Sequence, residues 1–582
     1  MASTTTLVTL DNYASKMPGW APNQPNHLYA LVDMGSNGIR FSISDLSPPQ
    51  TRLLRCLYRE RAAISLFDAL DASSSSPGNL VLPPDTISLV AKTLARFRSI
   101  ADDYGVPAEH ISVFATEAMR TAQNAASMLE AIRAESGLGV YVLAPQVETL
   151  FGAVGARSGF TSAKGLFLDL GGGSVQMTYL DSSMEDYEIV TAQTGESLPF
   201  GAAKLMKVFE SDTAKIQVAD FHTGMRSAVA KLERRFPSLK DAQGTESEGV
   251  DIYLCGGGFR GYGSILMHSD PIRPYPIPAI GTYTVGGALF SRTQDMRKVN
   301  AEFDGKIFGM SKRRRRQFPA IATVVEALVG AVRKIRTATF CAGGNREGAL
   351  FMKLPRGMRE ENPLPLLYQV SGDVELETQR SAMGIIGSSL PGDFDLSEVP
   401  TVFTLGIGPL FISGIWSRTG EPSEANASFE LHHAVIRDPS VPGFAHLARA
   451  VLGLTLCSRW GASFGPIDQQ LYTNLQKLVS RANPEATFWA EYIGAVSSLL
   501  AEVCPAKPDS PEKLRNLIKF NSAVTLGRRK AKIHLTVSLS PVLFRDLNHE
   551  ALQSSFEKVG RHQHTAGGLG RKVELSVQKM QY

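Results

Sequence analysis

Two glycine-rich loops, each led by an aspartate, carry the residues best suited to chemistry in this chain. They read Asp33-Met-Gly-Ser-Asn-Gly-Ile-Arg40 and Asp169-Leu-Gly-Gly-Gly-Ser-Val-Gln176. Each follows a short apolar run, residues 28–32 and 165–168, which predicts a strand, a carboxylate at the strand end and a turn. Glycine lets the backbone approach an anion, and successive N–H groups in such a turn form a nest for phosphate. The pair of loops therefore predicts two related lobes that hold one phosphate chain between them.

The polar atoms of both loops suit phosphate and a metal ion. The candidate phosphate-binding residues of the two loops are Gly35, Ser36, Asn37, Gly171, Gly172, Gly173 and Ser174. Asp33 and Asp169 are placed to hold Mg²⁺ or another divalent cation, which would neutralise phosphate directly or through water. Arg40 and Arg120 can bind phosphate oxygens in a bidentate manner, and the alternative for each is a structural ion pair.

Such loops need α/β lobes to position them, and strand patterns do alternate with helical patterns from residue 28 to residue 350. The further strands expected in the first part are residues 39–44, 111–115 and 140–143. The helices expected there are residues 84–104, 121–136 and 145–157. The pattern starts again at residue 166 and reaches a third glycine turn at Gly256, Gly257 and Gly258.

We predict four regions along the chain. Residues 1–26 are polar and rich in Pro and Asn, which is typical of a flexible tail. The first lobe is expected at residues 27–123 and the second at 124–355. A mainly helical C-terminal domain is expected at 360–582, and period-two alternation near its end predicts a small β segment.

Composition excludes several classes of protein. Of the 582 residues 43% are hydrophobic and 20% charged, and no run of about 18 uncharged apolar residues offers a membrane span. The chain starts without the basic and apolar stretches of a secretory signal. The five cysteines lack CxxC spacing, which favours a reducing compartment, and a net charge of +4 is too small to indicate nucleic-acid binding. We therefore expect a cytoplasmic protein with no membrane and no nucleic-acid partner.

One basic run, Lys312-Arg-Arg-Arg-Arg316, stands out. It can form a solvated helix start or attract an anionic substrate, and the alternative is a nuclear targeting signal. The residues that follow, 318–328, have the pattern of a helix that enters a core. This favours the first two interpretations over targeting.

The ordered set of motifs resembles the exopolyphosphatase / guanosine pentaphosphate phosphatase (Ppx/GppA) family, within the actin-like ATPase superfamily. The motifs are Asp33-x-Gly-Ser-Asn-x-x-Arg40, Ala115-Thr-Glu-Ala-Met-Arg120, Glu148, Asp169-x-Gly-Gly-Gly-Ser174, Leu198-Pro-Phe-Gly201, Gly256-Gly-Gly258 and Arg346-Glu-Gly348. The resemblance implies two ribonuclease-H-like lobes with a cleft between them. It also implies hydrolysis of the terminal phosphate of polyphosphate or of a nucleotide polyphosphate such as guanosine pentaphosphate.

Within this family, the chain is similar to a fungal branch associated with nucleotide-dependent signalling from mitochondria to the nucleus. That likeness implies a second function, a nucleotide-binding regulator with cytoplasmic protein partners and weak or no turnover. A homodimer is compatible with either function, and the sequence does not decide between a monomer and a dimer.

Two glutamates are candidate catalytic residues. Glu117 follows the predicted strand 111–115 at the junction between the lobes, and with the family motif it is the candidate base that orients a water and accepts its proton. Its alternative is an acid in a helix first turn, favoured by the helix macrodipole. Glu148 is the second candidate, as a metal-linked acid or water orienter, and its alternative is a capping or surface residue. The superfamily suggests that the Gly256–Gly258 turn approaches a nucleotide base, and the alternative is an ordinary strand-to-helix turn.

Two departures from the family pattern weaken a catalytic interpretation, and the first of them, together with the helical extension described below, favours signalling. Gln176 stands where the family usually has Glu, and Gly38 replaces a usual Ser or Thr. Residues 366–505 resemble the helical extension that some members share with HD-type phosphohydrolases. The metal-binding His-Asp dipeptide of that extension is absent from the chain, so we expect a degenerate HD-like scaffold.

Overall fold

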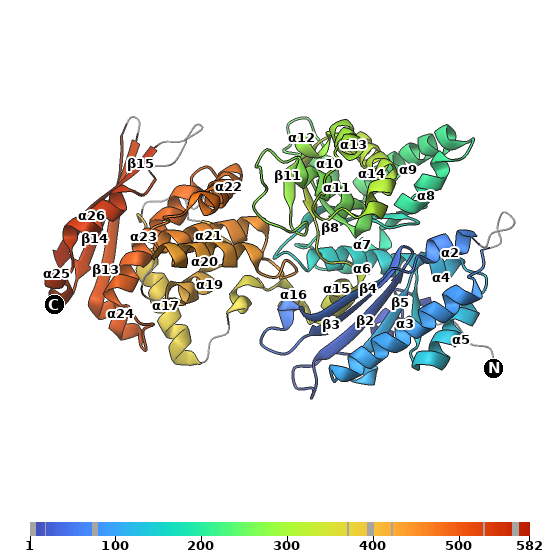
Figure 1. Ribbon diagram of the computed structural model, residues 1–582, viewed down its shortest axis with the longest axis horizontal. Helices are drawn as coiled ribbons and strands as arrows, with labels where there is room; N and C mark the ends of the chain where they lie inside the picture. Colours follow the sequence, from blue (N-terminus) through green and yellow to red (C-terminus); the bar gives the residue numbers. More distant parts are fainter. Residues whose placement is uncertain are drawn as a thin grey trace. The chain divides into compact units, whose positions relative to one another are not determined.

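The computed structural model describes residues 7–17, 19–72, 80–368, 372–392, 401–418, 420, 423–527, 530–560 and 570–581. The chain forms two compact units, whose elements are labelled in Figure 1. Unit 1 comprises Met1–Asp270, Ala279–Pro363 and Pro439–Pro442, and unit 2 comprises Pro271–Pro278, Leu364–Asp438 and Gly443–Tyr582. Both glycine-rich loops lie in unit 1.

The first lobe of unit 1 is built on a six-stranded sheet in the order β1-β6-β5-β2-β3-β4. Its strands are β1 (Leu7–Val8), β2 (Leu28–Gly35), β3 (Gly38–Asp45), β4 (Arg55–Ala62), β5 (Ile111–Ala115) and β6 (Val140–Leu143). Its helices are α1 (Tyr13–Lys16), α2 (Leu66–Ala72), α3 (Pro84–Asp103), α4 (Glu117–Thr121) and α5 (Ala125–Ser136). Strands β2, β3 and β4 pair antiparallel, whereas β5 and β6 continue the sheet from β2 in parallel.

The second lobe repeats this arrangement in the order β11-β12-β10-β7-β8-β9. Its strands are β7 (Lys164–Leu170), β8 (Val175–Asp181), β9 (Glu196–Leu198), β10 (Val250–Cys255), β11 (Thr284–Gly286) and β12 (Ile335–Phe340). Its helices are α7 (Tyr187–Gln193), α8 (Ala202–Phe209), α9 (Ala214–Arg235), α10 (Pro237–Ala242), α11 (Gly256–His268), α12 (Gly287–Phe290), α13 (Thr293–Glu302), α14 (Lys312–Ala331), α15 (Asn345–Lys353) and α16 (Arg356–Glu360). Strands β7, β8 and β9 are antiparallel, and β10 and β12 follow in parallel. The prediction of two ribonuclease-H-like lobes is confirmed.

Helix α6 (Pro145–Arg157) links the lobes and packs against both sheets. Its Leu150 and Phe151 belong to a buried cluster with Leu31 of the first sheet, whereas Ala153 lies in a cluster with Phe167 of the second sheet. Figure 1 shows α6 between the two sheets. Because alternate residues of a strand share a face, Asp33 and Asp169 point to the side of their sheets that α6 covers.

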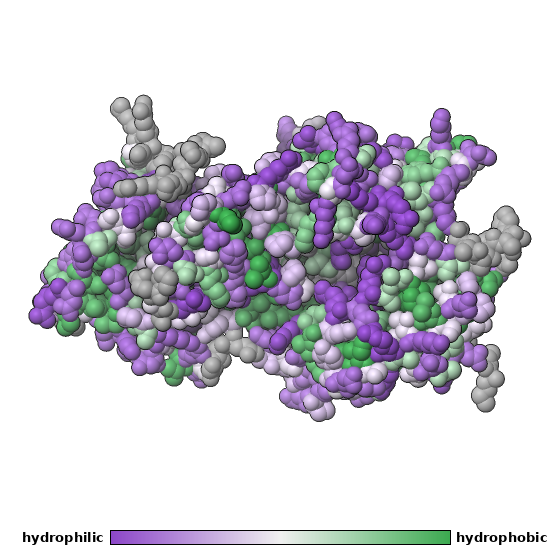
Figure 2. All heavy atoms as spheres, in the orientation of Figure 1, coloured by the Kyte–Doolittle hydropathy of each residue, from purple (hydrophilic) through white to green (hydrophobic). Residues whose placement is uncertain are grey.

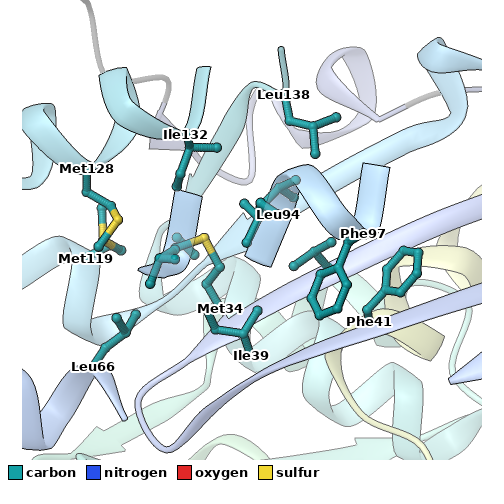
Figure 3. Packing of buried hydrophobic residues seen from close by; sticks show 14 of the residues in the cluster. Met34, Ile39, Phe41, Leu66, Leu94, Phe97, Met119, Met128, Ile132 and Leu138 are labelled. Carbon is teal, nitrogen blue, oxygen red and sulfur yellow. The ribbon is translucent and has the colours of Figure 1, made fainter. Parts of the chain in front are cut away.

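The other face of the first sheet carries its own core. Met34, Ile39 and Phe41 of the strands pack against Leu94 and Phe97 of α3, as Figure 3 shows. The Phe41 and Phe97 rings stack with their centroids 4.6 Å apart. Burial on both faces explains why the run at residues 28–32 is apolar throughout, without polar alternation.

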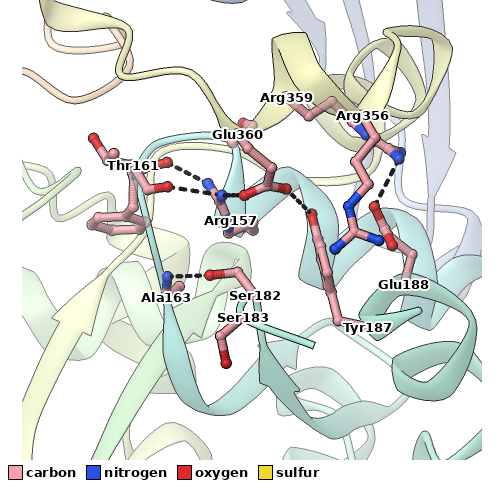
Figure 4. A network of polar contacts seen from close by, with 12 residues as sticks. Arg157, Thr161, Ala163, Ser182, Ser183, Tyr187, Glu188, Arg356, Arg359 and Glu360 are labelled. Carbon is pink, nitrogen blue, oxygen red and sulfur yellow. Dashed lines mark hydrogen bonds and ion pairs between the residues drawn. The ribbon is translucent and has the colours of Figure 1, made fainter. Parts of the chain in front are cut away.

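A buried polar network anchors α16, the last helix of unit 1 before the chain enters unit 2 (Figure 4). Arg157 at the end of α6 pairs with Glu360 at 2.6 Å, and Arg359 pairs with Glu188 of α7 at 2.9 Å. Arg52 of the first lobe is fully buried and donates to the backbone carbonyls of Ser158 and Arg359. Both lobes therefore hold this end of unit 1.

Two boundaries differ from those expected. Within the predicted flexible tail, residues 1–6 and 18 lie outside the described residues, but Leu7 and Val8 form β1, which pairs with β6. An apolar dipeptide at a sheet edge gains backbone hydrogen bonds that local composition does not reveal. Strand β6 also belongs to the first sheet, so the first lobe extends past the expected boundary at residue 123.

Unit 2 is mainly helical and ends in a three-stranded sheet, as expected. Its helices are α17 (Asp373–Gly387), α18 (Thr401–Thr404), α19 (Gly408–Ile415), α20 (Ser423–Ile436), α21 (His446–Arg459), α22 (Pro466–Ala482), α23 (Ala486–Val503), α24 (Pro511–Leu517), α25 (Pro541–Asp546) and α26 (His549–Glu557). Its strands are β13 (Ile518–Leu526), β14 (Lys530–Leu539) and β15 (Gly570–Lys579). Strand β13, which pairs antiparallel with β14, was not among the predicted strands.

The surface agrees with the absence of a predicted span. In Figure 2, hydrophilic side chains cover much of the visible face and apolar ones lie in small groups. Among the described helices, none is long and apolar enough to cross a bilayer. All five cysteines are free thiols.

Candidate active site

Both glycine-rich loops are turns of antiparallel hairpins, and the hairpins have the same register. In the first, Asp33 lies opposite Arg40 across β2 and β3. In the second, Asp169 lies opposite Gln176 across β7 and β8. Residues opposite one another in an antiparallel pair point to the same face of the sheet. Arg40 and Gln176 therefore occupy equivalent places, each beside the aspartate of its own lobe.

The start of α8 holds the second hairpin in position. The backbone N–H groups of residues 201–204 donate to the carbonyl oxygens of Gly171, Gly172 and Gly173, at distances of 2.8 to 3.1 Å. In a trans peptide the N–H points away from the carbonyl of the same unit. The N–H groups of Gly172, Gly173 and Ser174 therefore point away from α8, which leaves them available to an anion. This accounts for the Leu198-Pro-Phe-Gly201 motif.

The two lobes meet at the hairpin turns. A Cβ atom at Gly172 would collide with the side-chain amide of Asn37, and one at Gly173 would collide with the carboxylate of Glu117. Only glycine permits this approach. Glu117 is the first residue of α4, as the helix-start alternative predicted, and its carboxylate also lies against the second hairpin. The structure thus brings Asn37, Glu117, Gly172 and Gly173 together.

Three carboxylates lie around α6. Burial raises the pKa of Asp33 and of Asp169, and Asp33 adds to the rise at Asp169. Burial also raises the pKa of Glu148 to about 7, opposed by Arg120 and reinforced by the two aspartates. Glu148 is neither a capping nor a surface residue, because its side chain is 14% exposed and pairs with Arg120 at 2.9 Å. The alternative considered for Glu148 is therefore wrong.

Replacing Glu148 by Gln should change stability in a pH-dependent way. The pKa of Glu148 is about 7 in the folded protein and near 4.5 in the unfolded chain. The contribution of this carboxyl to the free energy of unfolding is therefore fully present below pH 4.5 and is lost as the pH rises through 7. From about pH 5 to pH 8, the unfolding free energy of Glu148→Gln should rise relative to wild type by about 2 kcal/mol, measured by urea denaturation in EDTA. Glu130→Gln, on the exposed side of α5, is the control. Parallel pH profiles for Glu148→Gln and wild type would contradict this assignment.

A group of arginines surrounds the first hairpin. Burial, and then the charge of Arg40, lower the pKa of Arg61 and of Arg260. Burial and the neighbouring arginines lower the pKa of Arg314 to about 10. Among the described residues, no hydrogen bond or ion pair engages the guanidinium of Arg40. Such a concentration of positive charge favours an anion.

Arg120 has a different environment from Arg40. Its Nη1 donates to the carbonyl of Leu143 at 2.6 Å, and its Nη2 pairs with Glu148. The structural ion pair that was the alternative for Arg120 is present. A phosphate contact by Arg120 stays a prediction.

The third glycine turn begins helix α11 and packs closely on the second hairpin. Gly256 has φ +84°, and a Cβ atom there would collide with Asp169, so both backbone and space require glycine. A Cβ atom at Gly258 would collide with the side chain of Leu170, whereas Gly257 lies near Arg40. These contacts account for the turn by packing, and nucleotide binding by Gly256, Gly257 and Gly258 stays a prediction.

The two departures from the family pattern have local explanations. A Cβ atom at Gly38 would lie 2.8 Å from Nε of Arg61, whose Nη2 donates to the carbonyl of Asn37. Gln176 is buried and accepts from Thr149, while its amide donates to Ser174 at 3.3 Å and to Ser197 at 3.0 Å. The Ser174 hydroxyl therefore accepts from Gln176 and keeps its own proton for another acceptor.

Two cavities help to locate the site. One of about 20 Å³ lies between α6 and the second sheet, lined in part by Glu148, Asp169 and Gln176, and has room for one water. Another of about 510 Å³ lies at the opposite ends of β7 and β10, near Lys164 and Val250. The larger cavity contains none of the predicted site residues, so we place the site at the hairpins.

Several residues that surround the hairpins were not among the predicted site residues. Arg346 is buried beside Asp33, Asn345 opposes the rise that burial causes in the pKa of Asp33, and Arg260 lies near Asp169. Two sequence features could have indicated these residues: the Arg346-Glu-Gly348 motif, and Arg260, which follows Gly258 by two positions. Neither feature says which carboxylate the arginine meets, because that depends on how α11 and α15 pack.

Two known domain families match the chain. Residues 46–357 match the Ppx/GppA phosphatase family, and residues 366–582 match the RTG2 C-terminal domain. The two matches meet near residue 364, where unit 2 resumes.

Individual proteins are also similar to this chain. The chain is 30% identical over 493 residues to Retrograde regulation protein 2 of Saccharomyces cerevisiae, covering 82% of this chain and 81% of that protein. It is 25% identical over 331 residues to Exopolyphosphatase 1 of Mycobacterium leprae, covering 56% and 88%. The solved structure of the Aquifex aeolicus PPX-GPPA enzyme has a TM-score of 0.43 and 20% identity, covering 56% of this chain and 99% of that one. Because the family match spans more than half of the chain and the yeast relative aligns over most of both sequences, the chain belongs to the Ppx/GppA phosphatase family.

Proposed function

We propose that unit 1 binds the phosphoanhydride chain of polyphosphate or of a nucleotide polyphosphate between its two hairpins, and hydrolyses the terminal phosphate with the help of Mg²⁺. The observation that carries this proposal is the meeting of the second hairpin with Asn37 and Glu117. It supports the proposal because backbone N–H groups that can bind an anion lie beside a carboxylate, while Arg40 lies on the first hairpin opposite Asp33.

The residues have separate tasks in the proposed reaction. Glu117 accepts a proton from the attacking water, a P–O bond forms to the terminal phosphorus, and the anhydride P–O bond breaks to release the shortened chain. The N–H groups of Gly172, Gly173 and Ser174, together with Arg40, hold the negative charge of the terminal phosphate. Glu148, which lines the small cavity beside α6, orients the attacking water.

Asp33 and Asp169 fit a bound Mg²⁺. Asp33 is buried and Asp169 is partly buried, and Oδ1 of Asp33 has no hydrogen-bond partner among the described residues. The part of the chain that the structure describes has no group of three or more His, Cys, Asp or Glu side chains arranged for a metal. Mg²⁺ commonly takes one or two carboxylates and completes its shell with waters and phosphate oxygens. When bound, the ion would neutralise phosphate charge.

A phosphate-release assay tests the proposal. Purified protein is incubated with polyphosphate, ATP, GTP or guanosine pentaphosphate, with Mg²⁺ or with EDTA. We expect release from polyphosphate or guanosine pentaphosphate only when Mg²⁺ is present. If calorimetry shows neither binding nor release with any of the four, the proposal is wrong.

The second candidate function is a nucleotide-binding regulator with weak or no turnover, of the mitochondria-to-nucleus signalling type, which acts through protein partners. Three observations favour it. Residues 366–582 match the RTG2 C-terminal domain, and the yeast relative named above is a retrograde regulation protein. Gln176 also supplies no charge where the family usually has a carboxylate. Binding without release in the assay would favour this function.

Gln176→Glu tests whether the neutral side chain limits turnover. A carboxylate would accept hydrogen bonds from Ser174 and Ser197 and add negative charge beside Asp169. We expect Mg²⁺ affinity to rise by about tenfold, measured by calorimetry, and phosphate release to rise with it. Gln193→Glu, on the exposed side of α7, controls for net charge. Unchanged metal affinity would show that residue 176 is not part of the metal environment.

A further inference from the structure

Arg313 of the second lobe reaches across to the first lobe at the hairpin tip. Its Nη2 lies 2.7 Å from Oδ1 of Asn37, 3.0 Å from Oγ of Ser65 and 2.9 Å from the carboxylate of Asp68. Arg313 belongs to the basic run at the start of α14, whereas Ser65 and Asp68 lie at the start of α2. One guanidinium thus joins the two lobes at three points.

A second cation of the second lobe approaches the same segment. Nζ of Lys207 on α8 lies 4.8 Å from the centre of the Phe67 ring. The N–H of Phe67 donates to the carbonyl of Ser36 at 3.0 Å, which ties the segment to the first hairpin. The segment 65–68 is therefore hydrogen-bonded to the hairpin of its own lobe. It also contacts two cations of the second lobe, Arg313 and Lys207.

The contact of Arg313 is one that a phosphate ligand can replace. Arg61 lies beside Asn37, and its pKa is lowered first by burial, then by the charge of Arg40 and then by the charge of Arg313. Arg313 is therefore close enough to these arginines to share an anion with them. The side chain of Asp68 is 58% exposed, and exposed ion pairs are individually weak. A phosphate oxygen is a strong acceptor for arginine. An anion that enters beside Arg40 and Arg61 would therefore compete with Asp68 for Arg313.

We propose that Arg313 and the segment Ser65–Asp68 form a latch between the two lobes beside the first hairpin, supported by Lys207, and that a phosphate ligand must break this latch to enter or leave. The ligand in this inference rests on the proposed function, whereas the latch itself is independent of it. The latch gives part of the Lys312–Arg316 run a role that is neither a passive helix start nor a targeting signal.

A charge swap tests the latch in the full-length protein. The variants are Arg313→Asp, Asp68→Arg and the double variant, with Arg316→Asp on the exposed side of α14 as the matched control. We expect each single change to raise amide hydrogen exchange of residues 64–68 and of the hairpin tip by at least about fivefold, and the double variant to restore wild-type exchange. Exchange equal to wild type in both single variants, or a double variant as fast as either, would overturn the latch.

Ligand kinetics test the gating. Stopped-flow binding of a fluorescent polyphosphate of defined length is compared for wild type and Asp68→Ala. We expect association and dissociation to be faster by about threefold or more in Asp68→Ala, with a smaller change in affinity. Equal rates would show that the latch does not control ligand entry or release. If wild type binds no phosphate ligand, the proposed function and the gating fall together, and the exchange result still decides whether the lobes are latched.

Discussion

Replacement of Glu117 by Gln is expected to lower kcat for phosphate release by about 10²-fold or more, while Kd for the ligand changes by less than about threefold. The amide keeps the size of the side chain and its contact with the second hairpin, but it cannot accept the proton of the attacking water. Phosphate release gives kcat and calorimetry gives Kd. The two measurements together separate the chemical step from binding.

Two comparisons sharpen this experiment. Glu130→Gln on the exposed side of α5 carries the same chemical change away from the site and should behave as wild type. Glu148→Gln should lower kcat less, because Glu148 orients the water in our proposal and does not accept its proton. If Glu117→Gln keeps near-wild-type turnover and Glu148→Gln does not, Glu148 is the base.

Loss of both hairpin carboxylates should have the largest effect on ligand binding. Asp33→Asn combined with Asp169→Asn keeps the shape of both turns and removes the two charges that would hold Mg²⁺. We expect Mg²⁺-dependent affinity for polyphosphate or guanosine pentaphosphate to fall by at least about 100-fold. Calorimetric titrations with Mg²⁺ and with EDTA measure the loss. Asp181→Asn, at the far end of the second hairpin and as buried as Asp33, is the control.

Comparing Glu117→Gln with the double aspartate variant separates the two candidate functions. A regulator responds to ligand only through its differential affinity for two conformations, so binding and not turnover controls its output. If the chain is a regulator, Glu117→Gln should keep signalling in a cell reporter, and the double aspartate variant should lose it. If Glu117→Gln binds the ligand normally but loses the reporter signal, the chain acts as a hydrolase and the regulator function is wrong. Mg²⁺-dependent binding that survives in the double variant would rule out Asp33 and Asp169 as metal ligands.

The hairpins and their order could be predicted because each depends on neighbours in sequence. An apolar run, an aspartate and a glycine turn specify strand β2 and strand β7 with few tertiary contacts. Helix α6 at Pro145–Arg157 agrees with the predicted residues 145–157 for the same reason, since Pro145 suits its first turn. Strand β1 was missed because two residues at a sheet edge carry no periodic signal of their own.

Charged side chains were harder to assign, because their partners come from distant segments. Arg40 and Arg120 looked alike in sequence, yet Arg120 pairs with Glu148 and Arg40 stays unpaired among the described residues. Arg313 looked like one of several solvated arginines and instead contacts Asn37, 276 residues away in sequence. Nothing local distinguishes these cases, since a guanidinium carries the same charge and the same donors in each.

The sequence by itself determined the two strand–aspartate–glycine hairpins, the repeat of α/β lobes, the family and the position of Glu117 directly after a strand. Those features depend on backbone preferences and on hydrophobic period, which act within a few residues. Only the tertiary structure decided that α6 lies between the sheets, that Glu148 is buried against Arg120 with its pKa near 7, and that Arg313 spans the lobes. These outcomes depend on desolvation and on charge separation in space, which the order of residues along the chain does not reveal.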